Sequence, residues 1–276
     1  MNIKSTVLIC PRNDEEALMI LKLAEKLELA VIVSKQPHGA KLDRERDLLD
    51  RIRSIALEAK HVVIVEIPGP EAEEVLRSAG LDVSIIDHHR YDGLDRMKQE
   101  SSLEQFRAMF EIDDDRLVEW GFDAAMVRSV GVIDRGFVWA LKDAGYVGDD
   151  RKKALAYYRT LTEELGVDRR EKEEAAAKVA WEAREERDGV IIIQGAEDRV
   201  SIRDALSFII ASEFEEPQPV LIIQGERRMY MQDTPKAMAL YKAFGGFTFG
   251  QDRCWGILKE DGNLPSVDEV LAIVVS

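Results

Sequence analysis

The sequence predicts an α/β fold built on a parallel sheet, because two kinds of segment alternate along its N-terminal part. Short unbroken apolar segments, typical of buried strands, lie at residues 6–10, 30–34, 62–67 and 83–86. Segments with the apolar spacing of amphipathic helices lie at residues 14–29, 42–60 and 71–79. Parallel strands that are buried on both faces have continuous apolar sequences, and helical crossovers join them. The alternation therefore favours a parallel sheet covered on both faces.

The rest of the chain divides into a helical part and a second α/β part. Residues 101–187 show helical patterns only. Strand and helix candidates alternate again after residue 188, at residues 190–193, 203–212, 220–223, 234–243 and 254–258. We therefore expect a first domain over residues 1–165, a helical connector over residues 166–188 and a smaller α/β domain over residues 189–276.

Composition and charge restrict the classes of function. The chain has 276 residues, 46% of them hydrophobic, which is enough for a large core without disulfides. Its two cysteines, Cys10 and Cys254, fit a reducing cytoplasm. With 38 basic and 53 acidic side chains the net charge is −15, which argues against binding of long duplex DNA. No apolar run reaches the ~20 residues of a membrane span, so we expect a cytoplasmic protein.

Acidic and histidine side chains follow the predicted strands at the points where the strands end. Asp14 and Glu16 come after the first strand, Glu66 closes the third, and Asp87-His88-His89 follow the fourth. In a parallel sheet these ends lie at one edge, where crowded carboxylates repel one another unless a cation neutralises them. Mixed carboxylate and imidazole ligands suit Mn²⁺, Mg²⁺ or Fe²⁺. Two such ions about 3.5–4 Å apart can clamp a phosphate and activate a water.

Several of these residues also have a purely structural interpretation. Asp14 is a good cap for the helix that follows it, and Glu16 is then a first-turn acid favoured by the helix dipole. Glu66 closes a buried strand and needs a partner. An Asp-His-His run directly after an apolar strand is harder to explain structurally. Asp134 follows an apolar turn expected at residues 131–133.

The segment Val83-Ser84-Ile85-Ile86-Asp87-His88-His89 resembles the third motif of the DHH phosphoesterase superfamily. That superfamily includes RecJ-type exonucleases, nanoRNases, cyclic-dinucleotide phosphodiesterases, exopolyphosphatases and family II pyrophosphatases. The resemblance extends over nearly the whole chain. It implies a parallel-sheet DHH domain, a helical connector and a smaller associated C-terminal domain, with the active site between the two domains.

The resemblance also implies roles for individual residues. Asp14 and Glu66 would hold one metal ion, and Glu16, Glu66, His88 and Asp134 would hold a second. Asp87 and His89 would be catalytic, with His89 facing the substrate phosphate. The expected cofactor is Mn²⁺ or Mg²⁺, with two ions.

The chain departs from the family pattern at the metal ligands and in the second domain. Glutamates stand at positions 16 and 66, where the family has aspartates, so each carboxylate moves by more than about 1 Å and metal number or choice can change. The family's glycine-rich loop retains Gly245 and Gly246 but lacks its histidine, and Gln232-Asp233 replace an Arg-Ser pair. Candidates for phosphate binding are these two glycines and, by bidentate hydrogen bonding, three arginines: Arg90, Arg135 and Arg253. For Arg90 and Arg135, which directly follow expected ligands, an ion-pairing role is an equal alternative.

Two functions follow from these observations. The first is a metal-dependent phosphoesterase that hydrolyses a small phosphoester or phosphoanhydride, such as a short oligonucleotide, a cyclic dinucleotide, a nucleotide or polyphosphate. The second is a catalytically weak or inactive relative that binds a ligand and regulates a partner. The expected partner is a small phosphorylated substrate, not long duplex DNA and not a membrane. Short single-stranded nucleic acid and homodimer formation are left open.

Overall fold

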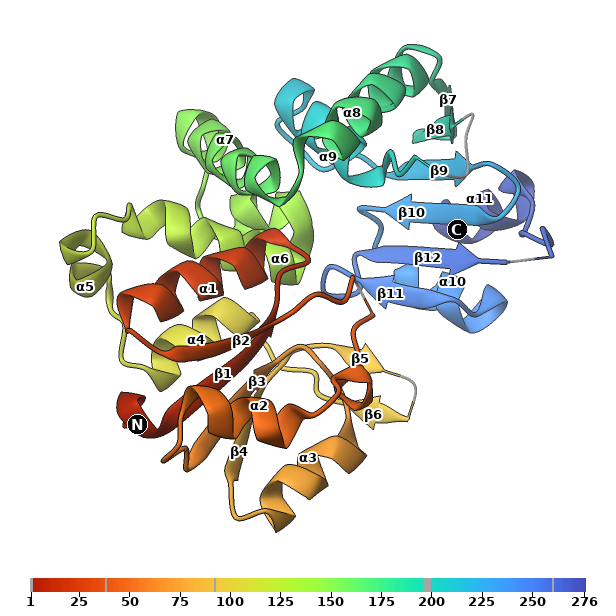
Figure 1. Cartoon of the computed structure of the whole chain (residues 1–276). Helices are drawn as coiled ribbons and strands as arrows, with labels where there is room; N and C mark the ends of the chain where they lie inside the picture. Colours follow the sequence, from red (N-terminus) through yellow and green to blue (C-terminus); the bar gives the residue numbers. More distant parts are fainter. Residues whose placement is uncertain (1, 38, 92, 196–199, 260) are drawn as a thin grey trace. The chain divides into compact units, whose positions relative to one another are not determined.

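The computed structural model describes residues 2–37, 39–91, 93–195, 200–259 and 261–276 (Figure 1). The chain forms two compact units. Unit 1 comprises Met1–Arg135 and Ala156–Leu165, and unit 2 comprises Gly136–Leu155 and Gly166–Ser276. The predicted α/β class is confirmed, while the domain boundaries expected from the sequence stay a prediction. Among the described residues, no helix has the length and apolarity that crossing a bilayer requires.

Unit 1 is built on a four-stranded sheet in which every neighbouring pair is parallel. The strand order is β2-β1-β3-β4. The strands are β1 (Thr6–Pro11), β2 (Ala30–Ser34), β3 (His61–Val65) and β4 (Asp82–Ile86), and the helices between them are α1 (Glu15–Lys26), α2 (Leu48–Ile55) and α3 (Pro70–Ser78). A 3-10 helix, η2 (Leu42–Arg44), precedes α2, and η1 (Ile3–Ser5) precedes β1.

Both faces of this sheet are buried, which explains why its strands are apolar without interruption. Leu8 and Cys10 of β1 lie in the core that includes α1, whereas Val7 and Ile9 lie in the core that includes α2 and α3. Successive strand residues point to opposite faces, so each strand supplies both cores. Figure 1 shows α1 on one side of the sheet and α2 and α3 on the other.

The order of the strands creates a switch point between β1 and β3. The chain passes from β1 to β2 on one side and then returns to β3 on the other side of β1. The crossovers therefore diverge at the carboxyl ends of β1 and β3, and ligands of open parallel sheets bind at such a point. Asp14 and Glu16 follow β1 and Glu66 follows β3, so the sequence places acidic residues there.

Helices and one short hairpin complete the N-terminal part. They are β5 (Arg90–Tyr91), β6 (Leu94–Asp95), α4 (Ser102–Met109), α5 (Asp114–Glu119), α6 (Ala124–Asp143) and α7 (Gly148–Leu165). The expected turn at residues 131–133 is wrong, because these residues lie inside α6. Their apolar side chains continue the helical spacing of residues 124–130, and the glycine at 131 does not end the helix. Phe137 interrupts α6 instead, with a left-handed φ of 66°.

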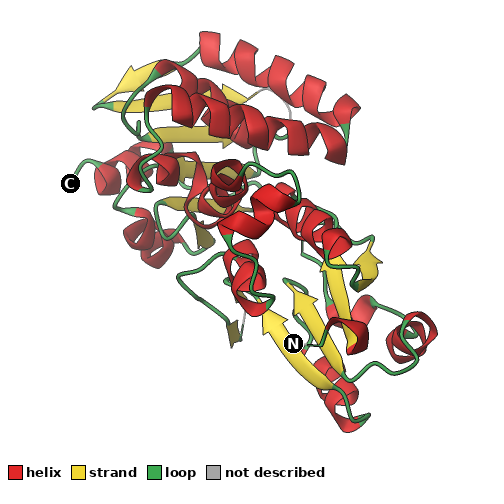
Figure 2. Ribbon diagram, turned by 90° about the vertical axis from the view of Figure 1, so that its left-hand side faces the viewer, coloured by secondary structure: helices red, strands yellow, loops and turns green. Residues whose placement is uncertain are grey.

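Unit 2 contains a six-stranded mixed sheet in the order β11-β12-β10-β9-β8-β7. Its elements are α8 (Val167–Glu182), β7 (Glu185–Arg187), β8 (Val190–Gly195), α9 (Arg203–Glu213), β9 (Val220–Gln224), β10 (Arg228–Gln232), α10 (Ala237–Phe244), β11 (Phe247–Phe249), β12 (Cys254–Leu258) and α11 (Val267–Val274). Only the β8–β9 pair is parallel. Helices flank the strands of this sheet in Figure 2.

Candidate metal centre

Four side chains from separate elements of unit 1 bring potential metal ligands together. Glu16 comes from the first turn of α1, Glu66 follows β3, His88 follows β4 and Asp134 lies in α6. One oxygen or nitrogen of each lies within 4.8 Å of the corresponding atoms of the others. A second group shares Glu66 and His88 and adds His89. The structure therefore brings together four of the five ligands predicted from the sequence.

His88 lies at the centre of this group. Its Nε2 atom is 2.8 Å from Asp134 Oδ2, 3.2 Å from Glu66 Oε1 and 4.0 Å from Glu16 Oε2. All four of these atoms are buried, yet none makes a hydrogen bond of regular geometry to any residue that the structure describes. Buried polar atoms are satisfied in nearly all proteins, so four such atoms that face one another fit the coordination of a cation.

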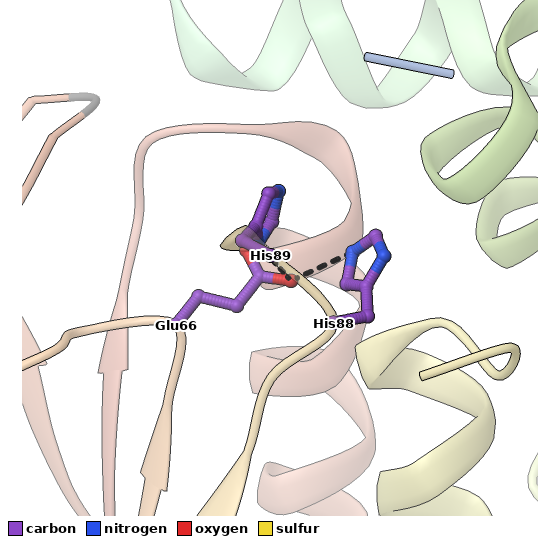
Figure 3. A group of neighbouring side chains, drawn as sticks. All are labelled: Glu66, His88 and His89. Atoms are coloured by element: carbon purple, nitrogen blue, oxygen red, sulfur yellow. Dashed lines mark ion pairs between the residues drawn. The ribbon is translucent and has the colours of Figure 1, made fainter. Parts of the chain in front are cut away.

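Figure 3 shows how Glu66 faces both histidines of the run that follows β4. Glu66 Oε1 is 3.2 Å from His88 Nε2 and 3.9 Å from His89 Nδ1. Glu66 has a left-handed backbone, with φ 50°, and its N–H donates to Ile86 O at 3.0 Å. A left-handed conformation is unfavourable for a glutamate, and such strain persists where the surrounding structure enforces it, as at functional sites.

Glu16 is oriented by the start of α4. Its Oε1 accepts a 2.9 Å hydrogen bond from the Leu103 N–H, and Ser101 provides a side-chain hydrogen bond. Only Oε2 then faces His88. A Cβ at Gly131 would collide with Ser101 Oγ, so the glycine allows α6 and Ser101 to approach each other. Sequence patterns around Glu16 gave no sign of these contacts, because they depend on elements far away in the chain.

The charges of the group strongly affect one another. Burial, followed by the nearby Asp134 and Glu66 carboxylates, raises the pKa of Glu16 well above its usual value. Burial also lowers the pKa of His88, but the Asp134 and Glu66 carboxylates outweigh it and raise the pKa to about 10. For Glu66, burial is outweighed by His88 and His89, which lower its pKa. The protonated His88 thus partly neutralises the acidic group.

The donor set fits a hard divalent cation. Three carboxylates and one imidazole match the oxygen and nitrogen ligands that Mn²⁺, Mg²⁺ or Fe²⁺ take. Cys10 does not supply a thiolate, because its Sγ approaches Ala17 O at 3.8 Å and burial raises the pKa of the thiol well above its usual value. A cation here would also satisfy the four unpaired atoms. The residues present therefore fit a metal ion.

Asp14 is the predicted ligand that the structure does not place in either group. Its Oδ1 accepts a 2.7 Å hydrogen bond from the Ala17 N–H, so the residue caps α1. Burial, then Glu66, raises the pKa of Asp14 well above its usual value, so it lies within electrostatic reach of the centre. Its role as a ligand stays a prediction.

Asp87 and His89, which were expected to be catalytic, differ in exposure. The His89 side chain is 46% exposed, whereas that of Asp87 is 1% exposed. Asp87 Oδ1 lies 3.0 Å from the His89 N–H and 3.2 Å from His89 Nδ1. Asp87 thus lies behind His89 and contacts it at two points. Both catalytic roles stay predictions.

The expected phosphate-binding arginines already have acidic partners. Arg90 Nε lies 3.3 Å from Asp95 Oδ2, Arg135 Nη1 lies 3.4 Å from Glu104 Oε2, and Arg253 pairs with Asp143. At Gly245 and Gly246 of unit 2, the local backbone explains why glycine is present. Gly245 has a φ of 74°, and a Cβ at Gly246 would collide with Gly256 O of β12. Phosphate binding by these five residues stays a prediction.

No family model and no curated protein matches the chain. Among solved structures, it is similar to an exonuclease RecJ bound to manganese, with 14% identity, a TM-score of 0.43 and coverage of 93% of this chain and 86% of that one. It is also similar to a pGpG-specific phosphodiesterase, PggH, of Vibrio cholerae, with 11% identity, a TM-score of 0.44 and coverage of 98% and 97%. An uncharacterized protein of Helicobacter pylori G27 gives 8% identity, a TM-score of 0.38 and 98% coverage of both chains.

Proposed function

We propose that the protein is a metal-dependent phosphoesterase that hydrolyses a small phosphoester or phosphoanhydride. The observation that carries the proposal is the convergence of four buried ligand atoms, which make no regular hydrogen bond, at the switch point of a parallel sheet. These atoms are Glu16 Oε2, Glu66 Oε1, His88 Nε2 and Asp134 Oδ2. Three carboxylates and an imidazole are a ligand set for Mn²⁺ or Mg²⁺, and not a self-sufficient structural cluster.

The ion, when bound, supplies Lewis-acid polarisation of a phosphoryl oxygen and lowers the pKa of a water. Glu16, Glu66, His88 and Asp134 would hold it. The overlapping group of Glu66, His88 and His89 offers ligand atoms for a second ion. Asp14 would join this second position if its carboxylate left the helix cap.

His89 would contact the substrate. Burial lowers its pKa, but Asp87 and then Glu66 outweigh this effect and raise it. The raised pKa favours the imidazolium form, which can donate a hydrogen bond from Nε2 to a phosphate oxygen or a proton to a leaving group. Its half-exposed position leaves it accessible to a ligand.

The overall charge favours a small substrate. A chain with net charge −15 repels a long polyanion, whereas bound cations attract a small phosphate at one point. A nucleotide, a cyclic dinucleotide, a short single-stranded oligonucleotide or a short polyphosphate meets this condition. Cys10 and Cys254 are both free and buried, so we expect a reducing compartment such as the cytoplasm.

One observation favours the alternative, a ligand-binding protein with little or no catalysis. The arginines expected to bind phosphate, Arg90, Arg135 and Arg253, each have an acidic partner. A substrate phosphate would have to replace these ion pairs. In that case the metal centre would bind a phosphorylated ligand without rapid turnover.

Metal analysis combined with hydrolysis assays tests the proposal. The purified protein is assayed with Mn²⁺ on bis-p-nitrophenyl phosphate, a short RNA and pyrophosphate. We expect turnover of at least one substrate and its loss in His88→Ala. His61→Ala is the matched control, because His61 begins β3 at the opposite end of the sheet and pairs with Asp82. Manganese binding without turnover on any substrate would support the alternative, and no binding of manganese would overturn both.

A further inference from the structure

A line of buried charges leads from α3 to His89 and includes residues that no sequence motif indicated. Arg96 pairs with Glu73 of α3 through Nη2, and its Nη1 lies 3.6 Å from Asp87 Oδ2. The side chains of Glu73, Arg96 and Asp87 are 5%, 11% and 1% exposed. Buried charges of this kind are strongly destabilising when a partner is lost, so their positions depend on one another.

Tyr91 gives Asp87 a further partner. Its hydroxyl donates to the carboxylate, at 3.2 Å from Oδ1 and 3.1 Å from Oδ2. The rings of Tyr91 and His89 are also neighbours, with centroids 6.0 Å apart. Asp87 is thus held from one side by Tyr91 and Arg96 and contacts His89 on the other.

In the neutral ring, the contact between Asp87 and His89 determines which nitrogen carries the proton, and protonation then adds the second proton at Nε2. A carboxylate can only accept, so His89 Nδ1, at 3.2 Å from Asp87 Oδ1, must be the donor. The neighbouring backbone N–H of His89 donates to the same oxygen at 3.0 Å. Nε2 is then the nitrogen left for a ligand. In Figure 3 the His89 ring extends away from Glu66.

We propose that Arg96 and Tyr91 are positioning residues that hold Asp87 so that His89 keeps its Nδ1 proton and presents Nε2 to the substrate. This inference rests on the proposed phosphoesterase function for its kinetic consequences. The two residues would not touch substrate or ion themselves. Hydrogen-bond partners that orient an active-site histidine typically contribute 10- to 100-fold to activity.

Two substitutions remove the contacts with little change in shape. Tyr91→Phe removes only the hydroxyl, and Arg96→Met removes the charge of a buried arginine. Arg96→Lys tests rescue by the conservative change. Tyr158→Phe is the control for Tyr91, because Tyr158 also donates to a carboxylate, Glu15, at 3.1 Å. Arg107→Met is the control for Arg96, because Arg107 is 13% exposed and pairs with Asp114 at 2.9 Å.

The first readout is the tautomer of the neutral His89 ring, measured by long-range ¹H–¹⁵N NMR above the pKa of His89 on metal-free and Mg²⁺-saturated protein. The chain has 4 histidines, so His89→Gln identifies the signals. We expect protonated Nδ1 in the wild type and in both controls, and a shift toward the Nε2–H form in Tyr91→Phe and Arg96→Met. A role limited to stability would leave the tautomer unchanged.

The second readout is kinetic and uses the substrate found for the wild type. Tyr91→Phe and Arg96→Met should lower kcat about 10- to 100-fold with KM changed less than about 3-fold, and Arg96→Lys should restore part of the loss. Manganese affinity should stay within about 3-fold of the wild type, since neither residue is a ligand. An unchanged tautomer, or kcat values equal to those of the controls, would overturn the positioning role. A wild type with the Nδ1–H tautomer, lost in both variants, but without hydrolysis would refute the proposed function and leave the positioning role standing.

Discussion

His88 Nε2 lies 2.8 Å from Asp134 Oδ2 inside unit 1, although the two residues come from different elements, the end of β4 and the middle of α6. With Glu66 Oε1 at 3.2 Å on the same nitrogen, a proton on His88 occupies the region in which a divalent cation would be bound. Proton and metal ion therefore compete for one group of side chains. This competition gives the predictions that follow.

The ion-free protein should lose stability as pH rises. The folded-state pKa of His88, about 10, lies above its ordinary 6.5, so the stabilisation is full below about 6.5 and is lost as pH rises through 10. Up to about 1.4 kcal/mol per pH unit is expected for one proton. Urea unfolding in EDTA between pH 6 and 10 measures the effect. His88→Gln should flatten the profile, and a wild-type stability that rises across this range would contradict the assignment.

Glu16→Gln should separate stability from metal binding. The amide retains an oxygen for the Leu103 N–H, and it removes a carboxyl group whose ionisation is opposed by burial, Asp134 and Glu66. Ion-free protein should therefore be stabilised, by about 1 kcal/mol at pH 7. Manganese should raise the unfolding temperature of the wild type and not that of the variant.

The control for this prediction is Glu15→Gln, one residue earlier in α1. Glu15 accepts from Tyr158 and Thr162 and belongs to neither ligand group. This variant should keep the stabilisation by manganese. An equal response to manganese in Glu16→Gln and in the wild type would exclude Glu16 as a ligand.

Gly131→Ala should displace Glu16 without removing it. The new methyl group collides with Ser101 Oγ, and overpacking of this kind costs about 1–3 kcal/mol. Because Ser101 and the start of α4 orient Glu16, manganese affinity should also fall, by about 10-fold. Isothermal titration and urea unfolding measure the two effects.

Adding Ser101→Gly to Gly131→Ala removes the colliding hydroxyl. Glycine is tolerated as an N-cap at a cost of a few tenths of a kcal/mol, so most of the stability should return. A double variant as unstable as Gly131→Ala alone would show that the collision is not with Ser101.

Sequence patterns predicted the part of the site that depends on strand ends. Parallel strands bring Glu16, Glu66 and His88 to one edge wherever the sheet forms, and the apolar runs predict the sheet. Asp134 was placed after a turn and assigned to this group only through the family resemblance, whereas it lies inside α6. Gly131 lacks a Cβ and so allows α6 to approach Ser101, a contact that no local sequence pattern shows.

Other parts of the site depend on side-chain contacts between distant segments. The sequence around Asp14 fits both a helix cap and a metal ligand. The hydrogen bond from the Ala17 N–H to Asp14 confirms the cap and does not test the role as a ligand. For Arg90 and Arg135 the sequence favoured phosphate binding and ion pairing equally, and it did not identify the partners Asp95 and Glu104. Arg96 lies in no motif, and its burial between Glu73 and Asp87 results from the packing of α3 against the segment that follows β4.

Anomalous diffraction from crystals grown in manganese tests the central claim most directly. We predict a manganese peak within bonding distance of Glu16, Glu66, His88 and Asp134, with the Nε2 proton of His88 displaced by the ion. A second manganese peak next to His89 would show that the centre binds two ions. Crystals saturated with manganese that show no peak among these four side chains, or manganese bound only elsewhere, would contradict the account.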